Sequence, residues 1–277
     1  MELVKTYKDF IYGQSPKLKF RNILRSNYLY LKSLGRRLQK PGNWISFPYY
    51  HHVFDDERSG FERQLKYLKN VGDFISISDA VNLLTAEEKL NGKYFCVSFD
   101  DGYQCLYDNM LPITTSLDVP VIIYLPTDYI GLNPDKEADF KLIKENLPGN
   151  PKLLSFLDWD TCKVMQPHKI YFGSHTVSHT NLIDLAEEKL VNELLLSKKI
   201  IEKNLESDCL DFACPWGVVY KNFNPEITTP LAKKMGYRSF ASTNRGRNTS
   251  EKDVFRLKRD HLLANWPNAQ LKYFFGD

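Results

Sequence analysis

The chain has 277 residues, which suits one large domain or two small ones with a buried core. Its 43% hydrophobic and 26% charged residues are typical of a soluble globular protein and exclude a disordered chain or a collagen-like repeat. The net charge of +3 is unevenly distributed, because residues 1–40 carry ten lysines and arginines against only Glu2 and Asp9. The rest of the chain is therefore net acidic, and we do not expect nucleic-acid binding.

The sequence also bears on cellular location. No apolar run approaches 18 residues, so no transmembrane helix is predicted. The first nine residues lack the apolar segment and cleavage site of a signal peptide. The five cysteines are odd in number, which favours reduced thiols over a disulfide framework. We predict a cytoplasmic protein, with a peripheral position at the inner face of the membrane as the alternative.

Residues 1–42 are predicted to form a basic N-terminal helical extension, and residues 43–277 the main domain. The basic arm has the charge to contact an anionic membrane surface or a phosphate-bearing substrate. The alternative is a solvated helix that packs on the domain through one apolar face. That face would carry four side chains spaced three or four residues apart: Phe20, Leu24, Tyr28 and Leu31.

Strand and helix patterns alternate after the arm. Apolar runs predict strands at residues 44–50, 74–77, 94–99, 119–125, 170–172, 237–243 and 254–263, and another ending near residue 214. Helical patterns lie at residues 61–68, 79–84 (capped by Ser78), 107–117, 157–165 and 185–205, and a further helix closes at residues 232–236. Residues 131–151 are rich in Gly, Pro and charge and predict a surface insertion near the pocket. The alternation predicts a parallel α/β barrel with its chemistry at the carboxyl ends of the strands.

Two motifs carry that chemistry. Asp100 and Asp101 end one apolar run just before Gly102, and His175 and His179 follow another. One carboxylate and two imidazoles can bind a divalent metal and leave positions open for water and substrate. The second carboxylate is then free to act as a base. We expect a turn at Gly102 to present both aspartates, and the histidines to share one face of a helical turn.

Each motif has a simpler interpretation when taken alone. An Asp-Asp-Gly sequence is most often a solvated turn, and a His-x-x-x-His pair is often a surface feature. Both follow predicted strands, however, and α/β enzymes place their chemistry at strand ends. The combination therefore predicts a metal-dependent hydrolase.

Three motifs resemble the first three of the polysaccharide deacetylases, carbohydrate esterase family 4. In chain order they are Ser-Phe-Asp100-Asp101-Gly, Ser-His175-Thr-Val-Ser-His179 and Phe212-Ala-Cys-Pro-Trp-Gly217. The resemblance covers about residues 45 to 262. It implies a single-domain, deformed (β/α)7-type barrel that removes N-acetyl groups from amino sugars during surface polysaccharide biosynthesis. It also implies a divalent metal, with Zn²⁺ expected and Co²⁺, Ni²⁺ or Mn²⁺ as alternatives. A nucleotide-linked, lipid-linked or polymeric sugar remains open as substrate.

The resemblance also assigns roles to residues. Asp101, His175 and His179 would bind the metal, and Asp100 would be the general base. A backbone N–H beside Pro215, that of Trp216, would hold the oxyanion. The Trp216 ring is either a wall on which a sugar stacks or ordinary packing at the barrel end.

The chain departs from the family pattern at two positions. Ala213 occupies a place where many members have an arginine that steadies the base, and Arg259 could supply that charge; the alternative for Arg259 is a surface salt bridge. The general acid is the other departure. Tyr50-His51-His52-Val53 resembles the early motif of circularly permuted-looking members, so we predict His51 as the acid, with His52 on the other face. His261 is the alternative acid.

Two other functions stay open. The same metal site would serve hydrolysis of another amide, such as a formamide or cyclic imide. The alternative that is not an enzyme is a catalytically inactive metal- or carbohydrate-binding module. The spare Asp100 argues against that module, because metal binding alone does not require it.

Overall fold

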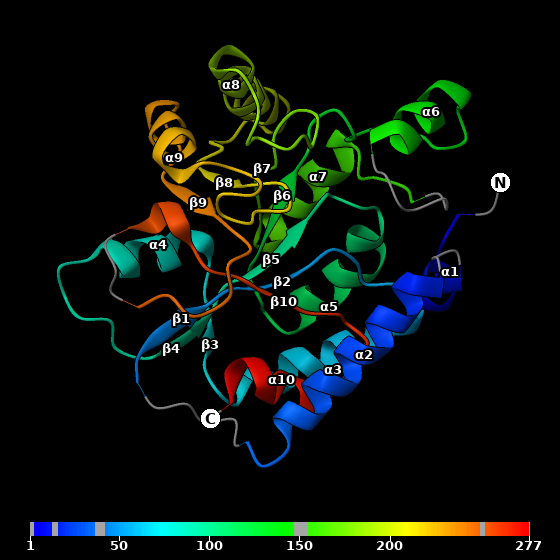
Figure 1. The fold of residues 1–277 in the computed structure, drawn as a ribbon, viewed down its shortest axis with the longest axis vertical. Coiled ribbons are helices and arrows are strands. Elements are labelled where there is room, and N and C mark those ends of the chain that lie inside the picture. The colour runs from blue at the N-terminus through cyan, green and yellow to red at the C-terminus, as the bar shows by residue number, and fades with distance from the viewer. Residues whose placement is uncertain (1–2, 13–15, 37–41, 147–153, 250–252, 277) are drawn as a thin grey trace.

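The computed structural model describes residues 3–12, 16–36, 42–146, 154–249 and 253–276. Its centre is a curled, all-parallel sheet surrounded by helices (Figure 1). The strand order is β10-β2-β5-β6-β7-β8-β9. The strands are β2 (Pro48–Tyr50), β5 (Val97–Asp100), β6 (Val121–Leu125), β7 (Ile170–Ser174), β8 (Asp211–Ala213), β9 (Ser239–Ala241) and β10 (Asp260–His261). A parallel bridge between Ala241 and Leu257 draws the two edges towards closure. The predicted deformed α/β barrel is confirmed.

A small second sheet has the order β1-β4-β3, with β1 at Trp44–Ser46, β4 at Lys93–Phe95 and β3 at Asp73–Phe74. It divides two runs that were each predicted as one strand. Residues 44–50 become β1 and β2 around Phe47, and residues 94–99 become β4 and β5 around Cys96. Both connecting residues are buried, so the apolar pattern continues through each break.

The helices follow the predicted order. They are α3 (Arg58–Lys69), α4 (Ile77–Thr85), α5 (Leu111–Ser116), α6 (Glu137–Asn146), α7 (Trp159–Met165), α8 (Glu187–Leu205), α9 (Pro225–Lys234) and α10 (Asn268–Phe275), with a π-helical turn at Leu106–Met110. Ser76 caps α4 by accepting from the Asp79 N–H, so the Ser78 cap was wrong. Ser78 instead accepts a hydrogen bond from Arg238. Of the predicted insertion, residues 147–151 lie outside the described residues.

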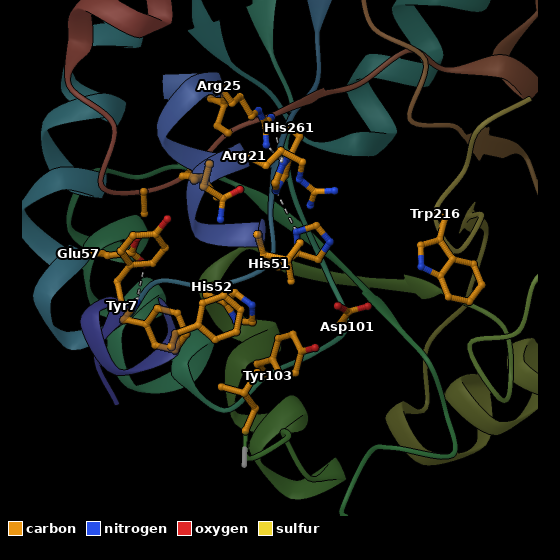
Figure 2. A pocket seen from close by; sticks show the side chains of 18 of the residues that line it. Tyr7, Arg21, Arg25, His51, His52, Glu57, Asp101, Tyr103, Trp216 and His261 are labelled. Carbon is orange, nitrogen blue, oxygen red and sulfur yellow. Dashed lines mark hydrogen bonds between the residues drawn. The ribbon is translucent and has the colours of Figure 1, made fainter. Parts of the chain in front are cut away.

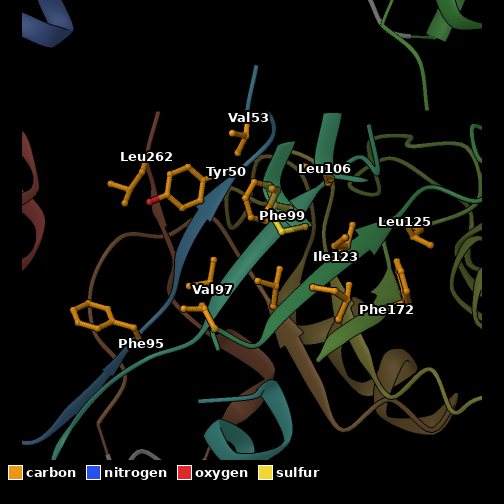
Figure 3. Close-up of a cluster of buried hydrophobic side chains, with 14 of the residues drawn as sticks. Tyr50, Val53, Phe95, Val97, Phe99, Leu106, Ile123, Leu125, Phe172 and Leu262 are labelled. Atoms are coloured by element: carbon orange, nitrogen blue, oxygen red, sulfur yellow. The ribbon is translucent and has the colours of Figure 1, made fainter. Parts of the chain in front are cut away.

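The main core lies between the sheet and the helices that cover it. Figure 3 shows Tyr50, Phe99, Ile123 and Phe172 projecting from neighbouring strands into one cluster. All five residues of β6 are buried. Continuous apolar strands of this kind are expected when both faces of a parallel sheet are covered. This packing fixes the strand ends at which the polar motifs lie.

The N-terminal arm contains α1 (Tyr7–Tyr12) and α2 (Pro16–Ser33), and α2 runs beside α10 (Figure 1). Leu29 of α2 is buried in the main core cluster. The face expected to pack on the domain is instead exposed: Phe20, Leu24, Tyr28 and Leu31. The helix thus packs through its opposite side, and that expectation was wrong. No helix among the described ranges is long and apolar enough to cross a bilayer.

Candidate active site

Two successive left-handed residues end β5 at the aspartate pair. Asp101 has φ 75° and Gly102 has φ 67°. Adjacent side chains of a regular strand point to opposite faces, so this turn is what allows both carboxylates to face the same end of the barrel. A Cβ atom on Gly102 would lie 2.7 Å from a methyl carbon of Leu125. Glycine at this position therefore relieves both backbone strain and a steric clash.

The histidine pair lies on an irregular loop directly after β7. His175 follows the last strand residue, Thr176 has φ 71° and His179 has φ 55°. No helix forms over these residues, so the expected helical turn was wrong. Left-handed conformations at non-glycine residues cost free energy and persist only where surrounding contacts impose them.

Glu193 of α8 supplies those contacts. Its carboxylate accepts hydrogen bonds from the Val177 N–H (2.8 Å), the Ser178 N–H (3.0 Å) and the Ser178 hydroxyl (2.8 Å). The His179 N–H donates to the Thr176 hydroxyl at 3.0 Å. The loop is therefore shaped by a carboxylate from the helix that follows it, which makes Glu193 a positioning residue that sequence reasoning missed.

The structure brings Asp101, His175 and His179 together as a buried cluster. Asp101 Oδ1 lies 3.3 Å from His179 Nε2 and 3.6 Å from His175 Nε2. One nitrogen or oxygen from each residue lies within 4.8 Å of the others. Two nitrogens and one carboxylate oxygen suit zinc and other divalent transition metals.

Hydrogen bonding within the cluster fits a bound cation. The His175 Nδ1–H donates to the Ala213 carbonyl at 2.8 Å, which leaves the Nε2 lone pair facing Asp101. Burial lowers the pKa of His175 to about 4, so the ring is neutral near pH 7. Asp101 Oδ1 and His179 Nδ1 are buried without a hydrogen-bond partner among the described residues. A divalent cation would compensate this carboxylate, and the residues present therefore fit the implied metal.

Asp100 is held apart from that cluster by Arg259. The guanidinium donates from Nη1 and Nη2 to the two carboxylate oxygens at 2.7 and 2.9 Å, and from Nε to the Ser242 carbonyl at 3.0 Å. Arg259 is fully buried, with its guanidinium carbon 4.4 Å from the centre of the Tyr49 ring. It is thus an internal partner of Asp100 and not part of a surface salt bridge.

The pair determines the charge state of Asp100. Burial alone would raise the pKa of this carboxyl, but the adjacent Arg259 outweighs burial and the pKa falls below its usual value. Asp100 is therefore ionised near neutral pH and can accept a proton. Ala213 is buried on β8 and has no charge to offer Asp100. The positive charge comes instead from Arg259, in the segment just before β10.

His51 and His261 are hydrogen-bonded partners. His51 Nδ1 lies 3.2 Å from His261 Nε2, and both Nη1 and Nη2 of Arg25 lie 3.4 Å from His261 Nδ1 (Figure 2). Arginine can only donate, so His261 Nδ1 accepts. Burial keeps the pKa of His261 well below its usual value, so its single proton resides on Nε2 and is donated to His51. His51 Nδ1 is thereby engaged by His261, and His51 Nε2 is the ring nitrogen left for a substrate.

His52 does not turn to another face, as was expected from strand alternation. Its ring lies 4.8 Å from the Phe54 ring and 4.5 Å from the Tyr103 ring, on the wall of the same cavity as His51. Burial lowers its pKa to about 3. The expectation failed because β2 ends at Tyr50, and strand alternation does not continue beyond that residue.

Trp216 lies in the turn after β8 with φ 53°. Its half-exposed ring lies 4.8 Å, edge to face, from the His179 ring. The backbone N–H of Trp216 donates to no acceptor among the described residues. The backbone carbonyl of Trp216 accepts from the Thr243 hydroxyl at 2.6 Å. The buried Pro215 carbonyl accepts from the Gly217 N–H at 2.6 Å and fixes the turn.

Two cavities meet at these residues. The arm-side cavity has a volume of about 440 Å³ and includes Tyr7, Arg21 and Arg25 from the N-terminal arm (Figure 2). The second cavity, of about 680 Å³, includes Asp100, His175 and Lys221. Four residues belong to both: His51, Asp101, His179 and Trp216. The candidate chemistry thus lies where two recesses join.

Residues 87–240, more than half of the chain, match the sequence profile of the polysaccharide deacetylase family. The chain belongs to this family. The resemblance predicted from the motifs is thereby confirmed. The match includes both aspartates, both histidines and Trp216. It does not reach His51 or Arg259, so the family match leaves their proposed roles untested.

Individual polysaccharide deacetylase relatives are distant. The chain is 24% identical over 200 residues to YxkH of Bacillus subtilis, covering 72% of this chain and 62%, less than two thirds, of that relative. It is 23% identical over 228 residues to poly-beta-1,6-N-acetyl-D-glucosamine N-deacetylase of Staphylococcus aureus (strain MSSA476), covering 76% and 71% of the two chains. The solved structure of IcaB from Ammonifex degensii aligns with a TM-score of 0.68 at 20% identity, over 85% of this chain and 98% of that one. This last likeness shows a shared fold.

Proposed function

We propose that this family member is a metal-dependent N-deacetylase that hydrolyses the N-acetyl group of an amino sugar. One observation carries the proposal: the Asp101, His175 and His179 cluster lies beside an ionised carboxylate, Asp100, that is held by a different partner. A site for metal binding alone does not need the second carboxylate. A hydrolytic site needs a base that the ligand set does not consume.

Metal binding and proton removal fall to different side chains of the site. Asp101, His175 and His179 would hold the cation, which when bound supplies Lewis acidity towards the amide carbonyl and acidity to a water. Asp100 accepts the proton of the attacking water. Arg259 orients both oxygens of Asp100 through its two hydrogen bonds.

Two further groups act on the substrate. The unpaired Trp216 N–H donates to the oxyanion that develops from the carbonyl. His51 donates a proton from Nε2 to the departing nitrogen as an imidazolium and is left as a neutral imidazole, since an amine leaves poorly unless it is protonated. A positioned acid of this kind contributes about 10²–10⁴ to the rate. His261 orients the His51 ring through the contact between His261 Nε2 and His51 Nδ1.

The substrate side of the proposal rests on shape and relatives. The half-exposed Trp216 ring beside the cluster offers an apolar face on which a sugar ring can stack. The printed name of the Staphylococcus aureus relative makes a β-1,6-linked N-acetylglucosamine oligomer the first substrate to test. A role in the biosynthesis of a surface polysaccharide is part of the same proposal.

The experiment compares substrates on metal-loaded protein. Chain loaded with Zn²⁺, Co²⁺, Ni²⁺ or Mn²⁺ is incubated with β-1,6-linked and β-1,4-linked N-acetylglucosamine oligomers, nucleotide-linked N-acetyl sugars and formylated amines. We expect acetate release from acetylated sugars that chelation or Asp100→Asn removes. Faster release of formate would favour the other amide hydrolase. Metal uptake without release from any substrate would favour the binding module.

A further inference from the structure

The outward face of α2 carries large apolar side chains that are more than half exposed, although the Tyr28 ring lies 6.1 Å from the Tyr273 ring of α10. Five of them, between 52% and 64% exposed, are Phe20, Ile23, Leu24, Tyr28 and Leu31. Their spacing of one, three and four residues places them along one side of the helix, which we call the outward stripe. The opposite side carries Leu29 into the core. Monomeric proteins rarely expose contiguous apolar patches of this kind without an interaction partner.

The charge around the stripe is of one sign. No aspartate or glutamate occurs anywhere from residue 10 to residue 54. Lys17, Arg21 and Lys32 are exposed on the same helix, and the Lys32 Nζ lies 5.8 Å from the centre of the Tyr28 ring. The helix therefore offers an apolar stripe with basic flanks, the pattern of helices that lie in the plane of an anionic membrane interface.

We propose that the outward stripe of α2 docks on an anionic lipid surface. The apolar side chains enter the boundary between headgroups and acyl chains, and Lys17 and Lys32 lie against the lipid phosphates. A second copy of the chain fits this face less well. A symmetric contact through the stripe would bring the same basic flanks of two helices together with no acidic residue on either α2 helix to compensate them.

Docking has a consequence for the cavity, and this consequence alone rests on the proposed function. The same helix contributes Leu18, Arg21, Asn22 and Arg25 to the arm-side cavity. A docked α2 would place that cavity beside the lipid headgroups. An amino sugar attached to a membrane lipid would then reach His51 and Asp101 without leaving the surface.

The test uses the full chain and sugar-free vesicles, so it is independent of hydrolysis. Co-sedimentation is measured with vesicles of phosphatidylcholine containing 30% phosphatidylglycerol and with phosphatidylcholine alone. We expect binding to the anionic vesicles only, weakened by 0.5 M NaCl. Phe20→Ser/Leu24→Ser/Leu31→Ser should lower the affinity at least tenfold. Lys17→Gln/Lys32→Gln should lower it less and reduce the salt dependence.

The matched control removes three apolar side chains from other helices. Val164, Leu196 and Ile227 are between 47% and 54% exposed, and their triple serine variant should bind like wild type. Circular dichroism checks that both triple variants fold. The proposal is overturned if wild-type protein does not bind anionic vesicles, or if the stripe variant binds them as wild type does. Light scattering that shows a stripe-dependent dimer without vesicle binding also overturns it.

Discussion

The two walls of the candidate site are held in different ways. Asp101 and His175 lie at the ends of β5 and β7, which are inner strands with neighbours on both sides. His51 directly follows β2 and His261 ends β10, strands of three and two residues, and His261 contacts Arg25 of the N-terminal arm. The ligand wall is therefore built within one continuous stretch of barrel. The acid wall is assembled from both ends of the chain and should be easier to perturb without loss of the other wall.

The largest expected effect breaks the ligand wall. Asp101→Asn, His175→Ala or His179→Ala should reduce bound metal from about one ion per chain to near zero and abolish turnover. Asp100→Asn should keep the metal and lose about 10²–10⁴ in rate. Elemental analysis and acetate release measure both quantities. Full metal occupancy in both histidine variants would contradict the ligand assignment, and a wild-type rate in Asp100→Asn would contradict the base.

The acid wall gives the next effect. His51→Ala should lower kcat on an amide by about 10²–10⁴, or roughly 2.7–5.5 kcal/mol, with metal content unchanged. The loss should shrink on an ester, because an alcohol leaves with less help from an acid. His261→Ala removes only the group that orients the His51 ring, so we expect about a tenfold loss. If kcat on the amide fell severely in His261→Ala and stayed nearly normal in His51→Ala, the acid role would belong to His261.

Arg259 joins the two walls, and its removal tests the buried pair. Arg259→Met leaves Asp100 charged and buried without a partner, which should lower the free energy of unfolding by about 3–5 kcal/mol. The acid limb of the kcat/KM profile should also move to higher pH, because the pKa of Asp100 is no longer held down. Urea denaturation should show that Asp100→Asn/Arg259→Met costs less than the two single changes added together. Additive losses would mean that the two side chains act independently.

The smallest effect concerns Glu57, behind the acid wall. Its Oε2 accepts from the Phe54 N–H at 3.1 Å, and burial raises its pKa to about 8. The folded chain thus keeps a proton that the unfolded chain releases above pH 4.5, so stability is full below that pH and declines as pH rises towards 8. Glu57→Gln should reduce the decline between pH 5 and pH 7 by about 1–2 kcal/mol. An unchanged slope in urea denaturation would show that Glu57 ionises normally.

The sequence predicted the barrel and the motifs because strands covered on both faces are continuous apolar runs that end in polar side chains. It missed the division at Phe47 and Cys96, since both residues are as apolar and buried as their neighbours. The conformation of the loop that carries His175 and His179 could not be predicted from local sequence patterns either. Its left-handed residues depend on Glu193, which lies outside the loop on the next helix and has the sequence pattern of any exposed acid of an amphipathic helix.

The orientation of α2 failed for a different reason. Its most apolar side carries Phe20 and Leu24, so amphipathicity predicted that side to face the core. In the structure the inward side of α2 also carries polar groups. Ser26 accepts a hydrogen bond from Gln270, and Arg25 contacts His261. A helical pattern identifies two faces, but only the neighbours of a helix decide which of them is buried.

The ion pair between Asp100 and Arg259 spans 159 residues, and this separation matters while the chain is being made. At about 5–20 residues per second, a ribosome needs roughly 8–30 s to extend the chain from the aspartate to the arginine. Throughout that interval the nascent barrel has no guanidinium to neutralise the carboxylate, and β2 has no β10 beside it. Release of the last segment thus completes the sheet edge and the charge balance together. A prematurely terminated product would carry both motifs recognised in the sequence but not a finished site.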